Sequence, residues 1–331
     1  MNTLRVGVIG VGHLGGLHAK MLAELPDVRL AGVFDLDRAR AERIAGEYRT
    51  IAFESVAGLL QETDAVTIAT TTSTHFAVAQ DVLSAGKHCF IEKPLTQTVE
   101  EADALCSMAQ ERGLILQVGH IERFNPAILA LESYDIKPLF IESHRLAQFN
   151  PRGTDVAVVL DLMIHDIDLI LSFVRSPVKS VEANGVAVVS DTVDIANARL
   201  QFENGCVANV TASRISQRRM RKMRLFQPNT YISIDFSEGM AEVFRLAGEG
   251  EPEHKGTLML GELGAGIRKK RILYEQPEVK QVNALKHELG LFAEAARTGS
   301  APLVSGEDGR RALEVANIIM QKISQQVIPL S

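Results

Sequence analysis

The first 120 residues alternate short apolar runs with segments of helical period, and this alternation constrains the fold more than any other feature of the chain. The apolar runs are rich in Val, Ile and Leu and cover residues 4–9, 28–34, 65–69, 88–91 and 115–118. Strands of a parallel sheet are buried on both faces, so they read as continuous apolar runs, and the helices between them cover those faces. The sequence therefore predicts an α/β domain over residues 1–120, built as a doubly wound parallel sheet of the Rossmann type.

After about residue 137 the chain changes to long β-type segments joined by turn-forming clusters. The segments cover residues 178–189, 196–202, 207–213, 222–226, 231–236 and 241–246. The clusters Glu203-Asn204-Gly205, Gln227-Pro228-Asn229 and Ser237-Glu238-Gly239 carry the residue types that tight turns need. This pattern predicts a second domain over residues 121–331, an α+β domain with a large, open and mainly antiparallel sheet.

Three further expectations concern the C-terminal third of the chain. Two helical segments near residues 282–297 and 306–324 close the chain, and the last can pack back on the first domain. Residues 248–270 are rich in Gly and Glu and then basic, and we expect them to form a mobile loop.

Composition limits the classes of partner. The 331 residues carry a formal net charge of −6, and 46% of them are hydrophobic, so the chain can bury two cores but has no overall attraction for nucleic acid or an anionic membrane. Cys89, Cys106 and Cys206 are widely spaced without a C-x-x-C pair, which is typical of neither a disulfide framework nor a structural zinc site. No apolar stretch is long enough to span a bilayer, and Met1 leads into an apolar run without a signal-peptide pattern. We therefore expect a cytoplasmic protein with no nucleic-acid or membrane partner.

A glycine-rich turn joins the first apolar run to the first helical segment. Gly10, Gly12 and Gly15 match the G-x-G-x-x-G pattern, with His13 and Leu14 inside it. The first glycine permits the tight turn, the second lets the backbone approach a pyrophosphate, and the third allows close helix packing. All five residues are therefore predicted to bind a dinucleotide cofactor.

Asp35 ends the second apolar run, twenty residues beyond Gly15, where a carboxylate can accept hydrogen bonds from the adenosine ribose. A carboxylate there repels a 2′-phosphate, so the sequence favours NAD over NADP. Arg38 is the competing signal, because an arginine nearby can accommodate that phosphate. The alternative for Asp35 itself is an ordinary aspartate at a helix start.

A hydroxyl-rich segment follows the apolar run at residues 65–69. Thr70, Thr71, Thr72 and His75 offer hydroxyls, backbone amides and an imidazole to the cofactor at the same crevice. A helix cap is the competing interpretation, and both can hold together.

Glu92-Lys93-Pro94 closes the apolar run at residues 88–91. Open α/β sheets bind ligands at the carboxyl ends of their strands, so a residue that ends a later strand faces the position of the nicotinamide. Pro94 restricts Lys93 to extended conformations and allows a cis peptide bond between them. We predict that Lys93 is catalytic and that Glu92 and Lys93 also line the cofactor site. A solvated loop lysine is the alternative.

Asp161 and His165 lie four residues apart in a segment of helical pattern, so their side chains share one face and can meet. A carboxylate beside an imidazole favours its protonated form, and a histidine can take a hydroxyl proton as hydride leaves the same carbon. We predict that both are catalytic. Asp166 and Asp168 lie close by, but the set is no familiar metal-ligand signature, so no metal is predicted. A packed histidine among solvated acids is the alternative.

Together these motifs resemble the Gfo/Idh/MocA oxidoreductases over nearly the whole chain. The resemblance rests on the glycine turn with Asp35, on Glu92-Lys93-Pro94, and on the D-x-x-x-H of Asp161 and His165. It implies a Rossmann domain, a second domain with an open sheet, and a sugar or cyclitol held between Lys93 and the Asp161/His165 pair. It also implies that Lys93 orients the reacting hydroxyl, that Glu92 holds the lysine and that His165 accepts the proton, although members differ in whether lysine or histidine takes that role. Homodimers or homotetramers built through the open sheets are implied as well.

The segment from Gly119 to Pro126 is similar to the G-H-x-x-R-F-N-P of nucleotide-sugar 3-dehydrogenases, which act on UDP-N-acetylhexosamines. The likeness implies NAD-dependent oxidation at C3 of such a sugar, with UDP-N-acetylglucosamine favoured, for amino-sugar or lipid A precursor synthesis. His120, Arg123 and Asn125 are then candidate substrate-binding residues, beside the catalytic residues named above. An ordinary turn before Pro126 is the alternative.

A UDP substrate needs cations for its diphosphate. Arg145 and Arg152 are candidates, and the other basic side chains cluster in one stretch: Arg214, Arg218, Arg219, Arg221, Lys222 and Arg224. A solvated sheet edge is the competing interpretation of that stretch. Two other functions stay open at this point. One is dehydrogenation of UDP-N-acetylglucosaminuronate or of a free polyol or sugar such as inositol or glucose, and the other is a catalytically silent NAD-binding regulatory protein.

Overall fold

The computed structural model of the protein describes residues 3–150, 156–248, 256–264 and 269–326. The chain forms two compact units, Met1–Ile121 with Asn283–Glu314 (unit 1) and Glu122–Val282 with Val315–Ser331 (unit 2). Arg152, a candidate for the diphosphate, lies outside the described residues.

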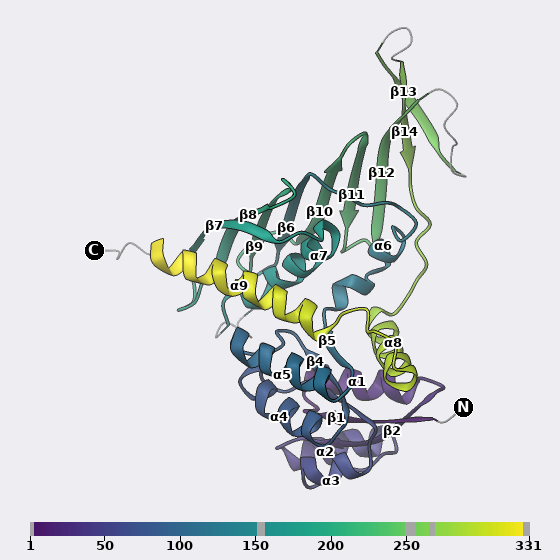
Figure 1. The fold of residues 1–331 in the computed structure, drawn as a ribbon, viewed down its shortest axis with the longest axis vertical. Coiled ribbons are helices and arrows are strands. Elements are labelled where there is room, and N and C mark those ends of the chain that lie inside the picture. The colour runs from purple at the N-terminus through teal and green to yellow at the C-terminus, as the bar shows by residue number, and fades with distance from the viewer. Residues whose placement is uncertain (1–2, 151–155, 249–255, 265–268, 327–331) are drawn as a thin grey trace. The chain divides into compact units, whose positions relative to one another are not determined.

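Unit 1 contains a five-stranded sheet whose neighbouring strands all run parallel (Figure 1). In spatial order the strands are β2 (Val28–Phe34), β1 (Leu4–Ile9), β3 (Ala65–Ile68), β4 (His88–Glu92) and β5 (Leu116–Gly119). The strand order reverses between β1 and β3, and open α/β sheets bind ligands at the carboxyl ends of strands at such a reversal. The predicted doubly wound sheet is confirmed, and each strand ends within one residue of its predicted bounds.

The helices of unit 1 lie between and after these strands. They are α1 (His13–Ala23), α2 (Arg38–Glu47), α3 (Val56–Gln61), α4 (Thr72–Ser84), α5 (Val99–Glu111) and α8 (Ala284–Thr298), while α9 (Gly306–Gln326) begins in unit 1 and ends in unit 2. The sequence pattern put α8 in the second domain, whereas the structure groups it with unit 1. The physical reason is burial, since Leu289 and Phe292 lie in the core of unit 1 and the Phe292 ring meets Phe90 edge to face at 5.6 Å.

Unit 2 contains a nine-stranded sheet in which all neighbouring strands are antiparallel except β6 and β9. Its spatial order is β13 (Leu258–Leu263), β14 (Lys270–Glu275), β12 (Met240–Ala247), β11 (Thr230–Asp235), β10 (Met220–Gln227), β6 (Phe140–Leu146), β9 (Val207–Ser213), β8 (Ile195–Phe202) and β7 (Val178–Val186). The predicted open, mainly antiparallel sheet is confirmed. Each turn cluster joins an antiparallel pair and contains one residue of positive φ, namely Gly205, Asn229 or Gly239.

Two differences from the expected strands have clear causes. The inner face of β6 carries Ser143 and Arg145 beside Ile141, so the apolar alternation that marks a strand is hidden. The expectation of a loop over residues 248–270 is wrong for its described middle part, where β13 pairs with β14. Leu258 and Met259 are more than half exposed, so the segment has no buried face to reveal it.

The two faces of the sheet in unit 2 differ. The inner face packs against α6 (Pro126–Leu129), the π-helical turn η2 (Val159–Met163) and α7 (Ile164–Val174). The outer face carries one aromatic side chain from each of five neighbouring strands, with ring centroids 5.0–5.9 Å apart. This aromatic row consists of Phe140, Phe226, Tyr231, Phe244 and Tyr274.

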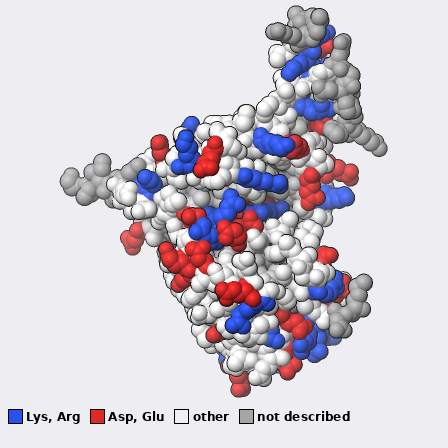
Figure 2. All heavy atoms as spheres, in the orientation of Figure 1, with Lys and Arg blue, Asp and Glu red and all other residues white. Residues whose placement is uncertain are grey.

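Charged side chains of both signs are interspersed on the face of the protein drawn in Figure 2, as expected from 35 basic and 41 acidic residues. Among the described residues, no helix has the length and apolar character needed to cross a membrane.

Candidate active site

The glycine turn of unit 1 fits a dinucleotide. Gly10 adopts a φ of +81°, and a Cβ on Gly15 would lie 1.8 Å from the carbonyl oxygen of Gly10, so neither position accepts a side chain. A Cβ on Gly12, by contrast, would meet nothing within 4 Å, and no side chain caps the helix that follows it. The turn thus presents open backbone and the uncapped N–H groups of α1, with His13 and Leu14 exposed beside it. Such a surface suits a pyrophosphate.

Asp35 directly follows β2 and is hydrogen-bonded to the backbone of this turn. Its carboxylate accepts hydrogen bonds from the backbone N–H groups of Val11 and Asp37, each at 2.8 Å. Its basic neighbour is Arg40, whose Nη1 lies 3.3 Å from Asp35 Oδ1, a contact that the sequence did not predict. Arg38 instead donates to Glu42 at 2.8 Å. A carboxylate therefore stands at the end of β2, as the motif requires, and it is paired with Arg40.

The threonine segment opens α4. Thr71 is the N-cap residue, but its side chain makes no capping bond, and the Thr74 hydroxyl donates to Thr70 Oγ1 at 2.8 Å. His75 is buried, with Nδ1 at 2.9 Å from the carbonyl oxygen of Pro94 and Nε2 at 3.2 Å from that of Thr70. Both ring nitrogens thus face backbone carbonyl oxygens of the protein, and a direct contact of His75 with the cofactor stays a prediction.

Glu92 and Lys93 end β4. Glu92 Oε1 lies 2.8 Å from Nε2 of His18, a residue of α1 that the sequence did not single out. Burial alone would raise the pKa of the Glu92 carboxyl, but the hydrogen bond from His18 and the charge of Lys93 lower it overall. The Lys93–Pro94 peptide bond is cis. Lys93 thus follows a carboxylate that is held ionised at the carboxyl end of a central strand.

Asp161 and His165 lie in unit 2, where the predicted regular helix is interrupted. Residues Val159–Met163 form the π-helical turn η2, which leads into α7. Single π-turns occur frequently at functional sites. Asp161 and His165 are both partly exposed, while the side chains around them are buried: Val159, Met163, Ile164, Asp166 and Ile167. Leu160 and Leu162 are partly exposed as well, and a contact between the Asp161 and His165 side chains stays a prediction.

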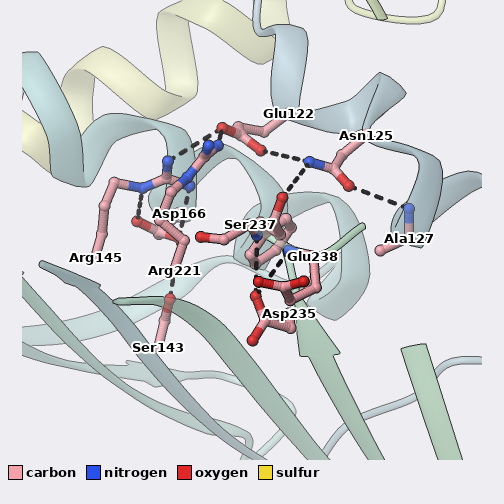
Figure 3. Close-up of polar contacts among 11 residues, drawn as sticks. Glu122, Asn125, Ala127, Ser143, Arg145, Asp166, Arg221, Asp235, Ser237 and Glu238 are labelled. Carbon is pink, nitrogen blue, oxygen red and sulfur yellow. Dashed lines mark hydrogen bonds and ion pairs between the residues drawn. The ribbon is translucent and has the colours of Figure 1, made fainter. Parts of the chain in front are cut away.

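A buried charge network fastens α7 to the sheet (Figure 3). The Arg145 guanidinium donates from Nε to Asp166 Oδ2 at 2.6 Å and from Nη2 to Asp166 Oδ1 at 3.1 Å, and Ser143 Oγ donates to the same carboxylate at 3.0 Å. Glu122 accepts hydrogen bonds from both Arg145 and Arg221. Arg145, a predicted substrate ligand, is thus paired with two carboxylates inside unit 2, and Glu122 and Arg221 join a network that no local pattern indicated.

The remaining predicted substrate residues are also engaged within the protein or buried. Arg123 forms a bidentate ion pair with Asp168 of α7, at 2.7 and 2.6 Å. Asn125 caps α6 by accepting from the Ala127 N–H at 3.1 Å, and its amide donates to Glu122 at 3.3 Å, as Figure 3 shows. His120 is buried. Direct contacts of these three with a substrate stay predictions.

The basic stretch divides into paired and exposed members. Arg214 donates to the backbone of Val156, Lys222 pairs with Asp235 and Arg224 with Glu142. Arg218 and Arg219 are exposed, in the connection between β9 and β10.

Among the described residues, no group of three or more His, Cys, Asp or Glu side chains could hold a metal ion.

Family models match both parts of the chain. One, described as an oxidoreductase family with an NAD-binding Rossmann fold, covers residues 4–120, and the GFO/IDH/MocA C-terminal domain covers residues 141–242. Unit 1 therefore contains an NAD-binding Rossmann fold.

Two curated relatives resemble the chain over most of its length. The UDP-N-acetylglucosamine 3-dehydrogenase of Acidithiobacillus ferrooxidans is 43% identical over 95% of both chains. The scyllo-inositol 2-dehydrogenase (NAD(+)) of Bacillus subtilis is 28% identical over 94% of this chain and 92% of its own.

Solved structures agree with these likenesses. The structure of the Acidithiobacillus ferrooxidans enzyme matches with a TM-score of 0.87 and 41% identity, covering 98% of this chain and 99% of the other. GenD2 from gentamicin A biosynthesis, solved in complex with NAD, matches with a TM-score of 0.79 over 98% of this chain and 95% of its own. At 19% identity, the second match shows the shared fold alone.

Proposed function

Since the chain belongs to the Gfo/Idh/MocA family of oxidoreductases, we propose that it oxidises the C3 hydroxyl of UDP-N-acetylglucosamine to the 3-keto sugar, with NAD as cofactor. The observation that carries this proposal is the 43% identity, over 95% of both chains, to a UDP-N-acetylglucosamine 3-dehydrogenase. The inositol dehydrogenase named above is only 28% identical, so a nucleotide sugar is favoured over a free polyol.

The reaction needs one group to hold the hydroxyl and one to take its proton. A bound nicotinamide would supply the hydride acceptor. Lys93, at the carboxyl end of β4, would donate a hydrogen bond to the reacting oxygen, and His165 would take the hydroxyl proton on a ring nitrogen. Asp161 would favour the imidazolium that results. The proposal thus requires Lys93 and His165 to reach the same hydroxyl.

A substrate panel tests the reaction directly. The protein is incubated with NAD and either UDP-N-acetylglucosamine, UDP-N-acetylglucosaminuronate, myo-inositol or glucose, and the absorbance of NADH is followed. Turnover with UDP-N-acetylglucosamine is expected to exceed that with each of the others. Turnover with inositol or glucose alone would show that the substrate is a free polyol or sugar and not a nucleotide sugar. NADH binding without turnover of any of the four compounds would favour a silent regulatory protein.

Two variants test the assigned roles. Lys93→Ala and His165→Ala are each expected to lower kcat by about 10²-fold or more while NADH still binds. Lys87→Ala and His144→Ala serve as controls, because Lys87 donates to the Thr63 carbonyl at the opposite end of β4 and His144 lies on the outer face of β6. Unchanged turnover in either test variant would overturn the roles for every substrate.

We assign the preference for NAD to the charge of Asp35. Asp35→Asn keeps an oxygen to accept from Val11 N–H but removes the repulsion of a 2′-phosphate, so the ratio of kcat/KM for NAD to that for NADP is expected to fall about tenfold. Asp37→Asn is the matched control, since asparagine caps α2 as well as aspartate does. An unchanged ratio in Asp35→Asn would transfer the preference to another group, such as Arg40.

We further propose that two or four copies assemble through the outer face of the sheet in unit 2. The aromatic row offers a continuous apolar strip on that face, with Phe226 37% exposed.

The product, a 3-keto sugar, is suited to amination and would serve amino-sugar or lipid A precursor synthesis. Three free cysteines suit a reducing cytoplasm, which stays the expected location.

A further inference from the structure

Two buried histidines of unit 1 contact the residues on either side of Lys93. His18 is bonded to Glu92 at 2.8 Å, and His75 faces the carbonyl oxygen of Pro94 at 2.9 Å. Both rings are at most 1% exposed. His18 belongs to α1, which follows the glycine turn, and His75 to the first turns of α4, which follows Thr70. Each histidine therefore connects a helix that begins at the cofactor site to one neighbour of the lysine.

The His18–Glu92 contact is closely defined by its surroundings. His18 Nδ1 is buried and has no hydrogen-bond partner among the described residues, so a proton on Nε2 avoids burying an unsatisfied donor. Nε2–H then donates to the Glu92 carboxylate. The ring of His18 meets Phe90 edge to face at 5.5 Å, and a Cβ on Gly119 would lie only 3.0 Å from Glu92 Cδ. The carboxylate is thus fixed on one side by an imidazole and on the other by the backbone of β5.

The His75 ring lies between α4 and the residue that follows Lys93. Burial lowers the pKa of His75, so at neutral pH the ring carries one N–H, and only one of the two carbonyl oxygens that face it can accept a hydrogen bond. The carbonyl oxygen of Pro94, at 2.9 Å from Nδ1, is nearer than that of Thr70, at 3.2 Å from Nε2. A proton on Nδ1 therefore ties α4 to Pro94 through one buried side chain.

We propose that His18 and His75 are positioning residues that hold Lys93 at the cofactor site by fixing Glu92 and Pro94. This inference rests on the catalytic role proposed for Lys93. The two histidines touch neither cofactor nor substrate in this scheme, and they act only through the backbone and carboxylate that flank the lysine.

Variants of His18 test the proposal. His18→Leu removes the donor to Glu92, and kcat is expected to fall about tenfold or more, because small misplacements of a catalytic group cost large factors in rate. KM for the sugar and the Kd of NADH are expected to stay within about twofold, since binding groups are untouched. His18→Gln retains an N–H donor and is expected to recover most of kcat. If His18→Leu does not fold, His75→Leu takes its place with the same expectation.

His88→Leu is the matched control for a purely structural effect. His88 lies at the opposite end of β4, where its Nδ1 accepts from the Ile115 N–H at 3.0 Å, so its loss weakens the same strand away from Lys93. It is expected to lower the unfolding temperature and leave kcat unchanged. If His18→Leu changes only stability, as His88→Leu does, the positioning role is wrong.

A double variant separates this inference from the proposed function. Because the histidines act through the lysine, adding His18→Leu to Lys93→Ala is expected to cost nothing further in the residual rate. Independent, multiplying losses would contradict the positioning role while leaving the catalytic role of Lys93 intact. Unchanged turnover in Lys93→Ala alone would overturn the proposed function itself.

Discussion

Arg145 lies on the buried face of β6 with its guanidinium between the carboxylates of Asp166 and Glu122. In the sequence it was one of several arginines suited to a diphosphate, and no neighbouring residue indicates that its partners are Asp166 and Glu122. Asp166 is 21 residues away and Glu122 is 23 residues away. Pairs at such separations leave no local pattern, so their existence could not be predicted.

The network predicts a strong effect on stability. Arg145→Met leaves two carboxylates buried without their shared cation and is expected to lower the free energy of unfolding by about 3–5 kcal/mol, measured by urea denaturation. Arg224→Met, which breaks the exposed pair with Glu142 on the outer face of the neighbouring strand, is expected to cost less than about 1 kcal/mol. Equal effects of the two variants would show that the buried network does not stabilise unit 2.

Residues that carry a local motif were found more readily than their partners. Asp35 and the three glycines lie at fixed spacings after an apolar run, and Lys93 lies at the end of another, so their placement follows from the chain alone. His18 was missed because it occupies an ordinary buried helical position and its partner Glu92 is 74 residues away.

The glycines at the start of α1 have two separate tasks. Gly15 allows close packing against Gly10, and Gly12 leaves room for the cofactor to bind. Gly12→Ala meets no protein atom within 4 Å, so it is expected to leave the unfolding temperature nearly unchanged and to weaken NADH binding about tenfold or more by blocking the approach of the pyrophosphate. Fluorescence titration with NADH measures the affinity.

Gly15→Ala is the contrasting variant. Its Cβ would overlap the Gly10 carbonyl oxygen at 1.8 Å, so the turn or the helix must shift, and the unfolding temperature is expected to fall as well. The division of tasks would be contradicted if Gly12→Ala destabilised the protein as much as Gly15→Ala does.

The connection between β7 and β8 is organised by one carboxylate. Burial alone would raise the pKa of Asp194, but hydrogen bonds from the N–H groups of Val188, Val189 and Ser190 and from the Ser190 hydroxyl lower it to about 2. A carboxyl whose pKa is depressed on folding stabilises the protein above its unfolded pKa, near 3.8, and loses that effect as the pH falls toward 2.

Asp194→Asn is therefore expected to lower the free energy of unfolding by about 2 kcal/mol at pH 7 and by about half as much at pH 3. Urea denaturation at the two pH values measures the difference. A loss independent of pH would mean that the geometry of the connection, and not the charge of Asp194, supplies the stability.

Elements with uniform faces were predicted well, and those with mixed faces were not. The continuous apolar strands of unit 1 and the turn-separated strands from β8 to β12 follow from their patterns. β6 was not predicted because two of the three side chains on its buried face, Ser143 and Arg145, are polar. The π-turn before α7 was not predicted because one extra residue in a helical turn leaves the residue composition unchanged.

The sequence indicated both sheets but not the path of the chain between the two units. Residues 283–314 return to unit 1 after the second sheet is complete, and only the burial of Leu289 and Phe292 against distant residues shows this. Amphipathic helices of similar pattern can cover either sheet, so periodicity alone does not decide.

Assembly through the outer face of unit 2 is tested by a charge placed in the aromatic row. Phe226→Glu puts a carboxylate between Phe140 and Tyr231 and is expected to convert oligomers into monomers, measured by light scattering after size-exclusion chromatography. Ser180→Glu, on β7 at the edge of the sheet, adds the same charge away from the row and is the control. An unchanged mass for Phe226→Glu would place the contact between copies elsewhere.

If the protein removes hydride from C3 of a UDP-N-acetylhexosamine, an isotope at that carbon must reach the cofactor. The most direct measurement uses UDP-N-acetylglucosamine deuterated only at C3, incubated with the protein and NAD, and determines the mass of the reduced cofactor. The deuterium is expected in the reduced nicotinamide. Reduced cofactor that carries no deuterium, or none formed at all while another sugar or polyol is oxidised, would contradict this expectation.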